Sequence, residues 1–157
     1  METKRGFGTI ELLVAVTLVT VVMSAALSVS NSALEARAQG MQNAQATLLL
    51  TQGAEAMRLI RDSGWATTSA LTLNQTYYPF YDGVMWKLLN ATSSMVDGTF
   101  DWRIRLNSVQ RDAGKRIVTS GGTVDPDAKL VTVTVAWKGR NGTTTRMLPI
   151  YLINIFQ

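Results

Sequence analysis

The chain has no cysteine and no histidine among its 157 residues, and each absence removes whole classes of function. Without cysteine, no disulfide can hold a small exported domain together. Without either residue, the common zinc and copper sites and the histidine-based catalytic triads are excluded. Catalysis would have to rest on Ser, Lys, Asp or Glu, and no spacing of these residues suggests a Ser-Lys dyad. We therefore expect no enzyme and no cofactor, and a domain held by core packing.

Charge is scarce near the N-terminus. In residues 7–29 Glu11 is the only charged residue, and Leu, Val, Ile and Ala dominate. A helix of about 20 apolar residues crosses the core of a bilayer. A carboxylate inside such a helix costs about 2.5–3.5 kcal/mol on insertion scales, which favours a functional role for Glu11. Lys4 and Arg5 precede the run, and the positive-inside rule then predicts a cytoplasmic N-terminus with the rest of the chain outside.

The residues around the start of this run, Gly6-Phe7-Gly8-Thr9-Ile10-Glu11, resemble the processing signal of type IV prepilins and type II secretion pseudopilins. In that family a glycine precedes the cleaved bond, a phenylalanine follows it, and a glutamate stands at the fifth mature position. Gly8 and Thr9 depart from the usual pattern of Ser or Thr followed by a large aliphatic residue. The resemblance implies that prepilin peptidase cuts after Gly6 and methylates the new N-terminus at Phe7.

The electrostatics of Glu11 agree with this resemblance. An N-terminal amine has a reference pKa of about 7.7–8.0, so cleavage would create a cation on each subunit. In a bundle of parallel helices, the amine of one subunit could neutralise Glu11 of its neighbour, whereas a buried charge without a partner costs several kcal/mol. The expected partners are prepilin peptidase, other pilin or pseudopilin subunits, an inner-membrane assembly platform and, before assembly, membrane lipid. The expected location is the inner membrane and then an extracytoplasmic pilus or pseudopilus.

Other interpretations of the same segment stay open. The run could be a secretory signal cleaved near Ser24-Ala25-Ala26, an unprocessed membrane anchor, or the buried helix of a soluble protein. The alternative function is then a membrane-anchored or secreted binding domain, including a role in DNA uptake.

The net charge of +4 permits contact with nucleic acid. DNA-binding proteins concentrate Lys and Arg in a patch, however, and here they are scattered, so we do not expect nucleic acid as a partner.

Helix-forming residues continue beyond the apolar run. No proline precedes Pro79, so we expect one helix from about residue 7 to residue 62, ended by Ser63-Gly64. Its expected parts are a leader (1–6), a membrane and assembly half (7–29) and an amphipathic half (30–62). Apolar or small residues at helical spacing predict the buried face of the amphipathic half. This predicted face comprises Leu34, Met41, Leu48, Leu49, Ala56, Met57 and Ile60, with Ala38 and Gln45 on the seam between the first three.

The predicted end of the helix carries a second, weaker resemblance. Residues 52–62, followed by Trp65, resemble the helix exit of minor pilins of the type IV pilus modification group. A neutral interpretation explains the same residues: Arg58, Arg61 and Asp62 form a charged last turn, and Trp65 covers the core. The type IV pilus and the type II secretion pseudopilus are not separated by these residues.

Residues 63–157 are expected to form an antiparallel sheet packed on residues 30–62, which makes a pilin-like α+β fold. In residues 101–106 the alternation places Trp102, Ile104 and Leu106 on one face and the arginines on the other. Asn141-Gly142 predicts a hairpin turn, and Pro149 marks an edge or a bulge. The expected strands cover residues 77–81, 84–89, 101–106, 116–119, 129–138 and 143–148. Residues 64–83 are expected to be mainly loop, and residues 151–156 form an apolar end of the chain.

Three further patterns are weak candidates for binding sites. Asp125-Pro126-Asp127 offers two carboxylates to a calcium ion, although a plain turn explains the same residues. Asn74, Asn90 and Asn141 each begin an Asn-x-Thr triplet, which turn chemistry also explains. A set of aromatic residues could bind a partner or a sugar, although most of it is expected in the core. This set comprises Trp65, Tyr77, Tyr78, Phe80, Tyr81 and Trp86.

Overall fold

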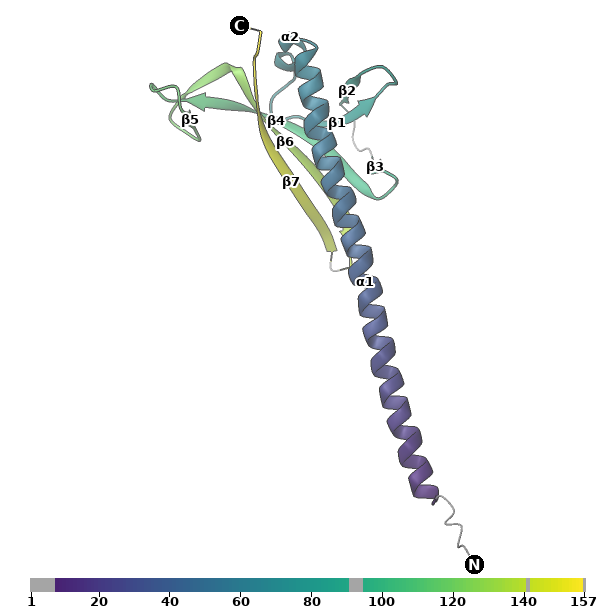
Figure 1. Ribbon diagram of the computed structural model, residues 1–157. Coiled ribbons are helices and arrows are strands. Elements are labelled where there is room, and N and C mark those ends of the chain that lie inside the picture. Colours follow the sequence, from purple (N-terminus) through teal and green to yellow (C-terminus); the bar gives the residue numbers. More distant parts are fainter. Residues whose placement is uncertain (1–7, 91–94, 141, 157) are drawn as a thin grey trace, which may run out of the picture. The chain divides into compact units, whose positions relative to one another are not determined.

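The computed structural model describes residues 8–90, 95–140 and 142–156, and it has the predicted α+β arrangement (Figure 1). The chain forms two compact units, the first ending at Gln42 and the second comprising Asn43–Gln157. The helices are α1 (Thr9–Asp62) and α2 (Trp65–Ser69). The strands are β1 (Thr76–Tyr81), β2 (Trp86–Leu89), β3 (Met95–Val96), β4 (Phe100–Arg111), β5 (Ile117–Val118), β6 (Thr123–Gly139) and β7 (Gly142–Ile153).

Helix α1 ends where the sequence predicts. The backbone N–H of Gly64 donates to the carbonyl of Arg61 (2.9 Å), and Gly64 then takes φ 145°, a conformation that residues with a side chain rarely adopt. The Ser63 hydroxyl donates to the carbonyl of Ile60 (2.7 Å). The following segment contains the short helix α2, where a loop was expected, and its first residue, Trp65, is half-buried against the core. The neutral interpretation of Trp65 is therefore confirmed.

The seven strands among the described residues of the second unit form one antiparallel sheet with the order β2-β1-β4-β6-β7, and the short strands β3 and β5 also pair with β4. The ladder between β4 and β6 is long and shifts register between Ser108 and Val109. Asp125, Pro126 and Asp127 lie in β6 at this shift. Their interpretation as a plain turn is therefore wrong. Pro126 fits the site because a bulge tolerates a residue without an N–H.

Strand β7 returns from β6 through the expected hairpin, in which Gly139 pairs with Gly142. Asn141, the predicted turn residue, lies outside the described residues. The strand continues without interruption through Pro149, which faces Thr132 in the register. Because β7 is the last strand in the sheet order, Pro149 lies on an edge strand, one of the two places that the sequence indicates for it.

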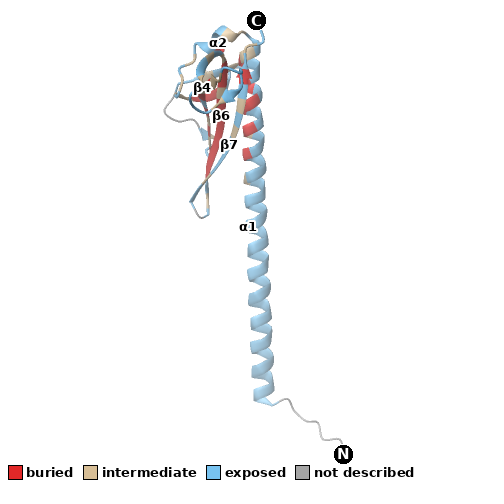
Figure 2. Ribbon diagram, turned by 90° about the vertical axis from the view of Figure 1, so that its left-hand side faces the viewer, coloured by how far each residue is buried: buried red, intermediate tan, exposed pale blue. Residues whose placement is uncertain are grey.

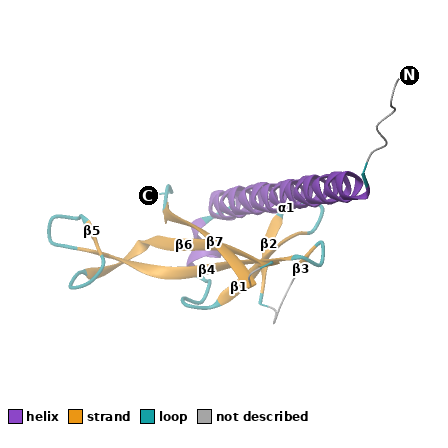
Figure 3. Cartoon of the chain, turned by 90° about the horizontal axis from the view of Figure 1, so that it is seen from below, coloured by secondary structure: helices purple, strands orange, loops and turns teal. Residues whose placement is uncertain are grey.

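The core of the second unit lies between one face of the sheet and the last part of α1, from Ala46 to Ile60 (Figures 2 and 3). Trp102, Ile104 and Leu106 are buried, as their alternation predicts. The buried residues of the helix include the predicted Ala56, Met57 and Ile60. Figure 3 shows the part of α1 that belongs to the second unit on one face of the sheet.

The first part of the predicted helix face is wrong. Leu48 is 70% exposed, and Leu34 and Met41 are also exposed, whereas Ala46, Leu50 and Ala54 are buried. Small residues fit the contact between α1 and the sheet because the helix approaches the sheet closely there. A Cβ atom at Gly53 would lie 2.7 Å from Cγ1 of Val133.

Candidate functional site: the apolar segment of α1

Glu11 lies in the first turn of α1 and is exposed. The helix begins at Thr9, where the backbone N–H groups of Glu11 and Leu12 donate to the carbonyl of Gly8 (2.9 and 3.2 Å). A carboxylate at this end of a helix interacts favourably with the helix dipole, by about 0.3–1 kcal/mol in water. The other two residues of the predicted processing site, Gly6 and Phe7, lie outside the described residues.

The apolar side chains that follow Glu11 are exposed in the described structure. Residues 12–34 contain no charge, and their large apolar side chains are each at least half exposed, from Leu12 to Leu34. An 18-residue window of α1 is apolar enough to cross a membrane, and none of that window is buried. The core helix of a soluble protein would be mostly buried, whereas a membrane span or a signal sequence near the N-terminus has the same length and apolar composition as this window.

Several hydroxyl groups in the apolar segment donate hydrogen bonds to carbonyls of the same helix. Thr17 donates to the carbonyls of Leu13 and Val14 (3.0 and 2.8 Å), and Thr20 donates to that of Val16 (2.8 Å). Ser24 donates to the carbonyl of Val21 (2.8 Å). These polar groups therefore do not need a partner from another helix when the segment lies in lipid. Glu11 is the only charged side chain of this segment.

The calcium candidates are occupied by other interactions. Oδ2 of Asp125 accepts a hydrogen bond from Nε of Arg111 (2.5 Å), and its Oδ1 accepts from the backbone N–H of Asp127 (2.9 Å). The Arg111 hydrogen bond holds the pKa of Asp125 below its usual range, although burial opposes it. Oδ1 of Asp127 accepts from Nδ2 of Asn154 (2.9 Å). Among the described residues no group of three potential metal ligands forms.

The structure divides the aromatic set between the core and the surface. Tyr77 and Tyr78 are buried, and the Tyr77 hydroxyl accepts a hydrogen bond from the backbone N–H of Thr72 (2.9 Å). Trp86 is half-buried and contacts the ring of Trp102 edge-on, with 6.0 Å between the ring centroids. Tyr81 is exposed beside Trp86, with 5.4 Å between their centroids. The exposed end of this aromatic row adjoins a groove.

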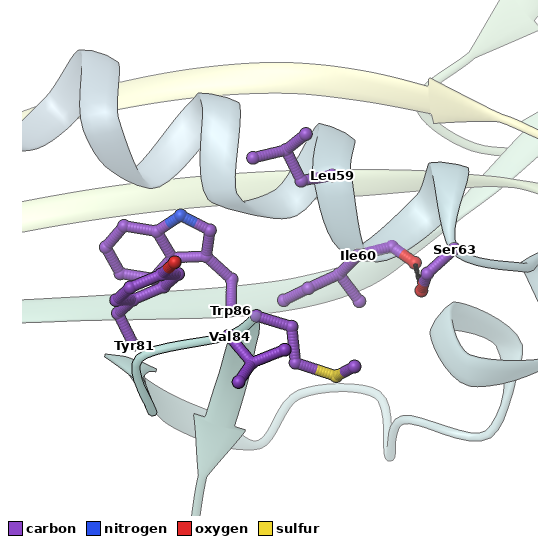
Figure 4. A pocket seen from close by; sticks show the side chains of 7 residues that line it. Leu59, Ile60, Ser63, Tyr81, Val84 and Trp86 are labelled. Carbon is purple, nitrogen blue, oxygen red and sulfur yellow. Dashed lines mark hydrogen bonds between the residues drawn. The ribbon is translucent and has the colours of Figure 1, made fainter.

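The groove lies in the second unit, between the end of α1 and the hairpin of β1 and β2 (Figure 4). Its volume is about 550 Å³, within the range of ligand pockets. Its lining side chains are mainly apolar, and its one aliphatic hydroxyl, on Ser63, already donates to the carbonyl of Ile60. The groove could not be predicted from the sequence, because its two walls come from distant segments whose contact no local pattern reveals. The lining residues are Leu59, Ile60, Ser63, Tyr81, Val84, Met85 and Trp86.

The hairpin wall of the groove is held in one conformation by Asp82. Oδ1 of Asp82 accepts hydrogen bonds from the backbone N–H groups of Val84 and Met85 (both 2.9 Å). Its Oδ2 lies 2.5 Å from Nζ of Lys87. The Lys87 interaction, helped by the two amides, holds the pKa of Asp82 well below its usual range. The turn therefore presents Val84, which is 79% exposed, and Met85 on a fixed backbone.

Comparison with known proteins finds no matching family model, no matching curated protein and no matching solved structure.

Proposed function

We propose that this chain is a structural subunit, a minor pilin or pseudopilin, of a type IV pilus or a related secretion filament. The observation that carries the proposal is the uncovered apolar segment of α1 with Glu11 as its only charge. The Gly6-Phe7 signal before it supports the same assignment. In this proposal the segment lies in lipid first and is covered by the same segment of neighbouring subunits afterwards.

The charge of Glu11 makes the transfer of the apolar segment from lipid to the filament favourable only after cleavage. In lipid a lone carboxylate is costly, and a neighbouring amine relieves that cost only once cleavage after Gly6 has created it. The unprocessed chain therefore stays in the membrane, and the processed chain gains free energy when its Glu11 meets the N-terminus of the next subunit. Thr17, Thr20 and Ser24 do not contribute to this selectivity, since their hydroxyls are satisfied internally.

The test compares Glu11→Ala with Glu35→Ala in the host that makes the filament. Glu35 is the next charged residue along α1 and lies beyond the apolar segment. We expect the Glu11 variant to be cleaved at the normal position and to be missing from sheared filaments, and the Glu35 variant to be cleaved and incorporated. If the Glu11 variant is incorporated as well as the unchanged chain, the proposed role of this carboxylate is wrong.

A second function, a membrane-anchored binding domain, is favoured by the apolar groove. An anchored domain does not need Glu11, and its removal would ease insertion by about 2.5–3.5 kcal/mol. The two functions therefore predict opposite effects of Glu11→Ala. With this substitution a filament subunit would no longer enter the filament, whereas an anchored domain would still bind its ligand and would accumulate in the membrane.

A further inference from the structure

The hairpin of β6 and β7 carries three cations and no acid between residues 138 and 146. Lys138 lies near the end of β6, Arg140 follows in the turn, and Arg146 lies in β7. All three residues are exposed. Among the described residues, neither Lys138 nor Arg146 forms an ion pair. We call these three residues, Lys138, Arg140 and Arg146, the basic hairpin.

The basic hairpin lies at the end of the second unit where α1 enters it. Val133 touches the helix at Gly53, because a Cβ there would lie 2.7 Å from Cγ1 of Val133. From Val133 to Gly139 the strand extends by about 20 Å at about 3.3 Å per residue. The helix between Gly53 and Asn43 is shorter, at about 15 Å. Figures 1 and 2 show the hairpin running past the buried turns of α1 toward that end of the unit.

The neighbouring charges leave this end of the sheet positive. Asp97, in the turn between β3 and β4, lies at the same end, because Val96 pairs with Phe100, which in turn pairs with Trp137. Asp101 is already bound to Arg103, whose guanidinium donates to its Oδ2 (2.9 Å). Arg105, farther along β4, donates to the carbonyl of Asn74 (3.0 Å). Asp97 therefore offsets one of the three cations of the basic hairpin.

The opposite end of the sheet is balanced in charge. It lies where Arg111 pairs in the register with Thr123. Two ion pairs form there, between Arg111 and Asp125 (2.5 Å) and between Arg116 and Asp112 (2.9 Å). Lys115 and Asp127 complete this end with one charge of each sign. The sheet is therefore positive at the end where α1 enters and neutral at the other end.

A short stretch of chain joins the second unit to the predicted membrane half of α1. That half ends at residue 29, and the second unit begins at Asn43. The residues between them are helical and span about 21 Å at 1.5 Å per residue. Headgroups occupy about 5–8 Å beyond the lipid core, and the field of their charges extends about 8–10 Å further. A tilted helix would only shorten the distance, so the long side chains of the basic hairpin can reach this field.

We propose that the basic hairpin binds the anionic headgroups of the membrane that holds the apolar segment. The contact would keep the second unit on the lipid surface until the chain enters the filament. This inference rests on the proposed function, because that function places the apolar segment in lipid before assembly. The charge complementarity favours an anionic surface. The tether favours lipid over nucleic acid, because it keeps the hairpin at a high effective concentration beside the headgroups.

The test uses the full chain in lipid nanodiscs with one fluorescent label. The chain has no cysteine, so Thr143→Cys gives a single labelling site in the hairpin. Ala113→Cys gives the control site in the turn between β4 and β5, and both positions are exposed. A lipid with a nitroxide on its headgroup quenches a label at the membrane surface. Nanodiscs that contain phosphatidylglycerol are compared with nanodiscs of phosphatidylcholine alone.

The label at Thr143→Cys should be quenched in the anionic nanodiscs and much less in the zwitterionic ones. The label at Ala113→Cys should be quenched in neither. Lys138→Gln/Arg140→Gln should lower the ratio of bound to free hairpin by about 30-fold, or about fivefold for each cation. Lys115→Gln/Arg116→Gln removes the same charge at the opposite end of the sheet and should change this ratio by less than about twofold, because that end lies beyond the screening length. Salt at 1 M shortens this length to about 3 Å and should release the hairpin.

Three results would overturn the inference. Equal quenching of the Thr143→Cys label in both lipids would mean that the tether alone brings the hairpin to the surface. No quenching in a chain whose apolar segment is inserted would exclude the contact and leave the proposed function standing. A DNA duplex that binds the chain in zwitterionic nanodiscs, and no longer binds Lys138→Gln/Arg140→Gln, would assign the hairpin to nucleic acid. Normal quenching together with incorporation of Glu11→Ala into filaments would support the lipid contact and count against the proposed role of Glu11.

Discussion

The close approach of α1 to the sheet at Gly53 predicts the effect of adding one methyl group. In Gly53→Ala the new Cβ would lie 2.7 Å from Cγ1 of Val133 and 2.9 Å from Nε1 of Trp102. Both neighbours are buried in the core and have little room to move. Overpacking of this kind costs about 1–3 kcal/mol, and we take the upper part of that range because two contacts are too short.

The same substitution also favours the helix, because alanine is about 0.8–1 kcal/mol better than glycine in a helix interior. The net expectation is therefore a loss of about 1–2 kcal/mol in the free energy of unfolding of the second unit. Gly40 provides the matched control, since a Cβ there would meet nothing within 4 Å. Gly40→Ala should leave that unit unchanged or stabilise the chain by up to about 1 kcal/mol.

The assay is urea unfolding of the full chain in mild detergent, followed by tryptophan fluorescence. All four tryptophans lie in the second unit, at positions 65, 86, 102 and 137, so the signal reports that unit alone. Gly53→Ala should unfold at lower urea concentration than the unchanged protein, and Gly40→Ala should not. If Gly53→Ala is as stable as Gly40→Ala, the helix does not contact the sheet as described.

Two further predictions concern the core and the polar end of the sheet. Ile104→Ala should lower the free energy of unfolding by about 2–5 kcal/mol in the same assay, because Ile104 is fully buried. Ile155→Ala, at an exposed isoleucine, should change the free energy of unfolding by less than about 0.5 kcal/mol. Asp125 has a lowered pKa through Arg111, so its charge stabilises the fold above about pH 4, the pKa of an unfolded aspartate, and this contribution disappears as the pH falls through the lowered pKa. Asp125→Asn should therefore lose less stability between pH 5 and pH 2 than the unchanged protein, in a urea titration at each pH, and an equal loss would contradict the assignment.

The parts of the fold that depend on local sequence could be predicted. The end of α1 follows from Ser63-Gly64, because only glycine takes the φ of 145° readily. The buried face of β4 follows from strict alternation at Trp102, Ile104 and Leu106, which a half-buried strand requires. These features need no knowledge of distant residues.

The parts that depend on how elements meet could not be predicted. Large apolar residues indicated a helix face through Leu48, whereas a close contact requires small residues such as Ala46 and Gly53. Hydrophobic periodicity does not measure the distance between a helix and a sheet. The proline in Asp125-Pro126-Asp127 favoured a turn, but a long strand with a register shift accommodates it.

The candidate site was likewise predictable only in its local part. Glu11 and its apolar surroundings are contiguous in the sequence, and the structure places them in one exposed helix as expected. The groove joins Leu59 to Val84 and Met85 across the end of α1, so its existence depends on tertiary contacts. Cleavage after Gly6 and methylation of Phe7 remain predictions.

The most direct test of the central claim is the mass of the N-terminal peptide of the protein recovered from its native host's envelope. We expect a chain that begins at Phe7 and carries one additional methyl group, because the pilin-type pathway cuts after Gly6 and modifies the new amine. A chain that still begins at Met1, or one that is cut near Ala26, would contradict it. A chain that begins at Met1 would have no terminus created next to Glu11, and a chain cut near Ala26 would have lost Glu11 altogether, so either result would exclude the proposed assembly role.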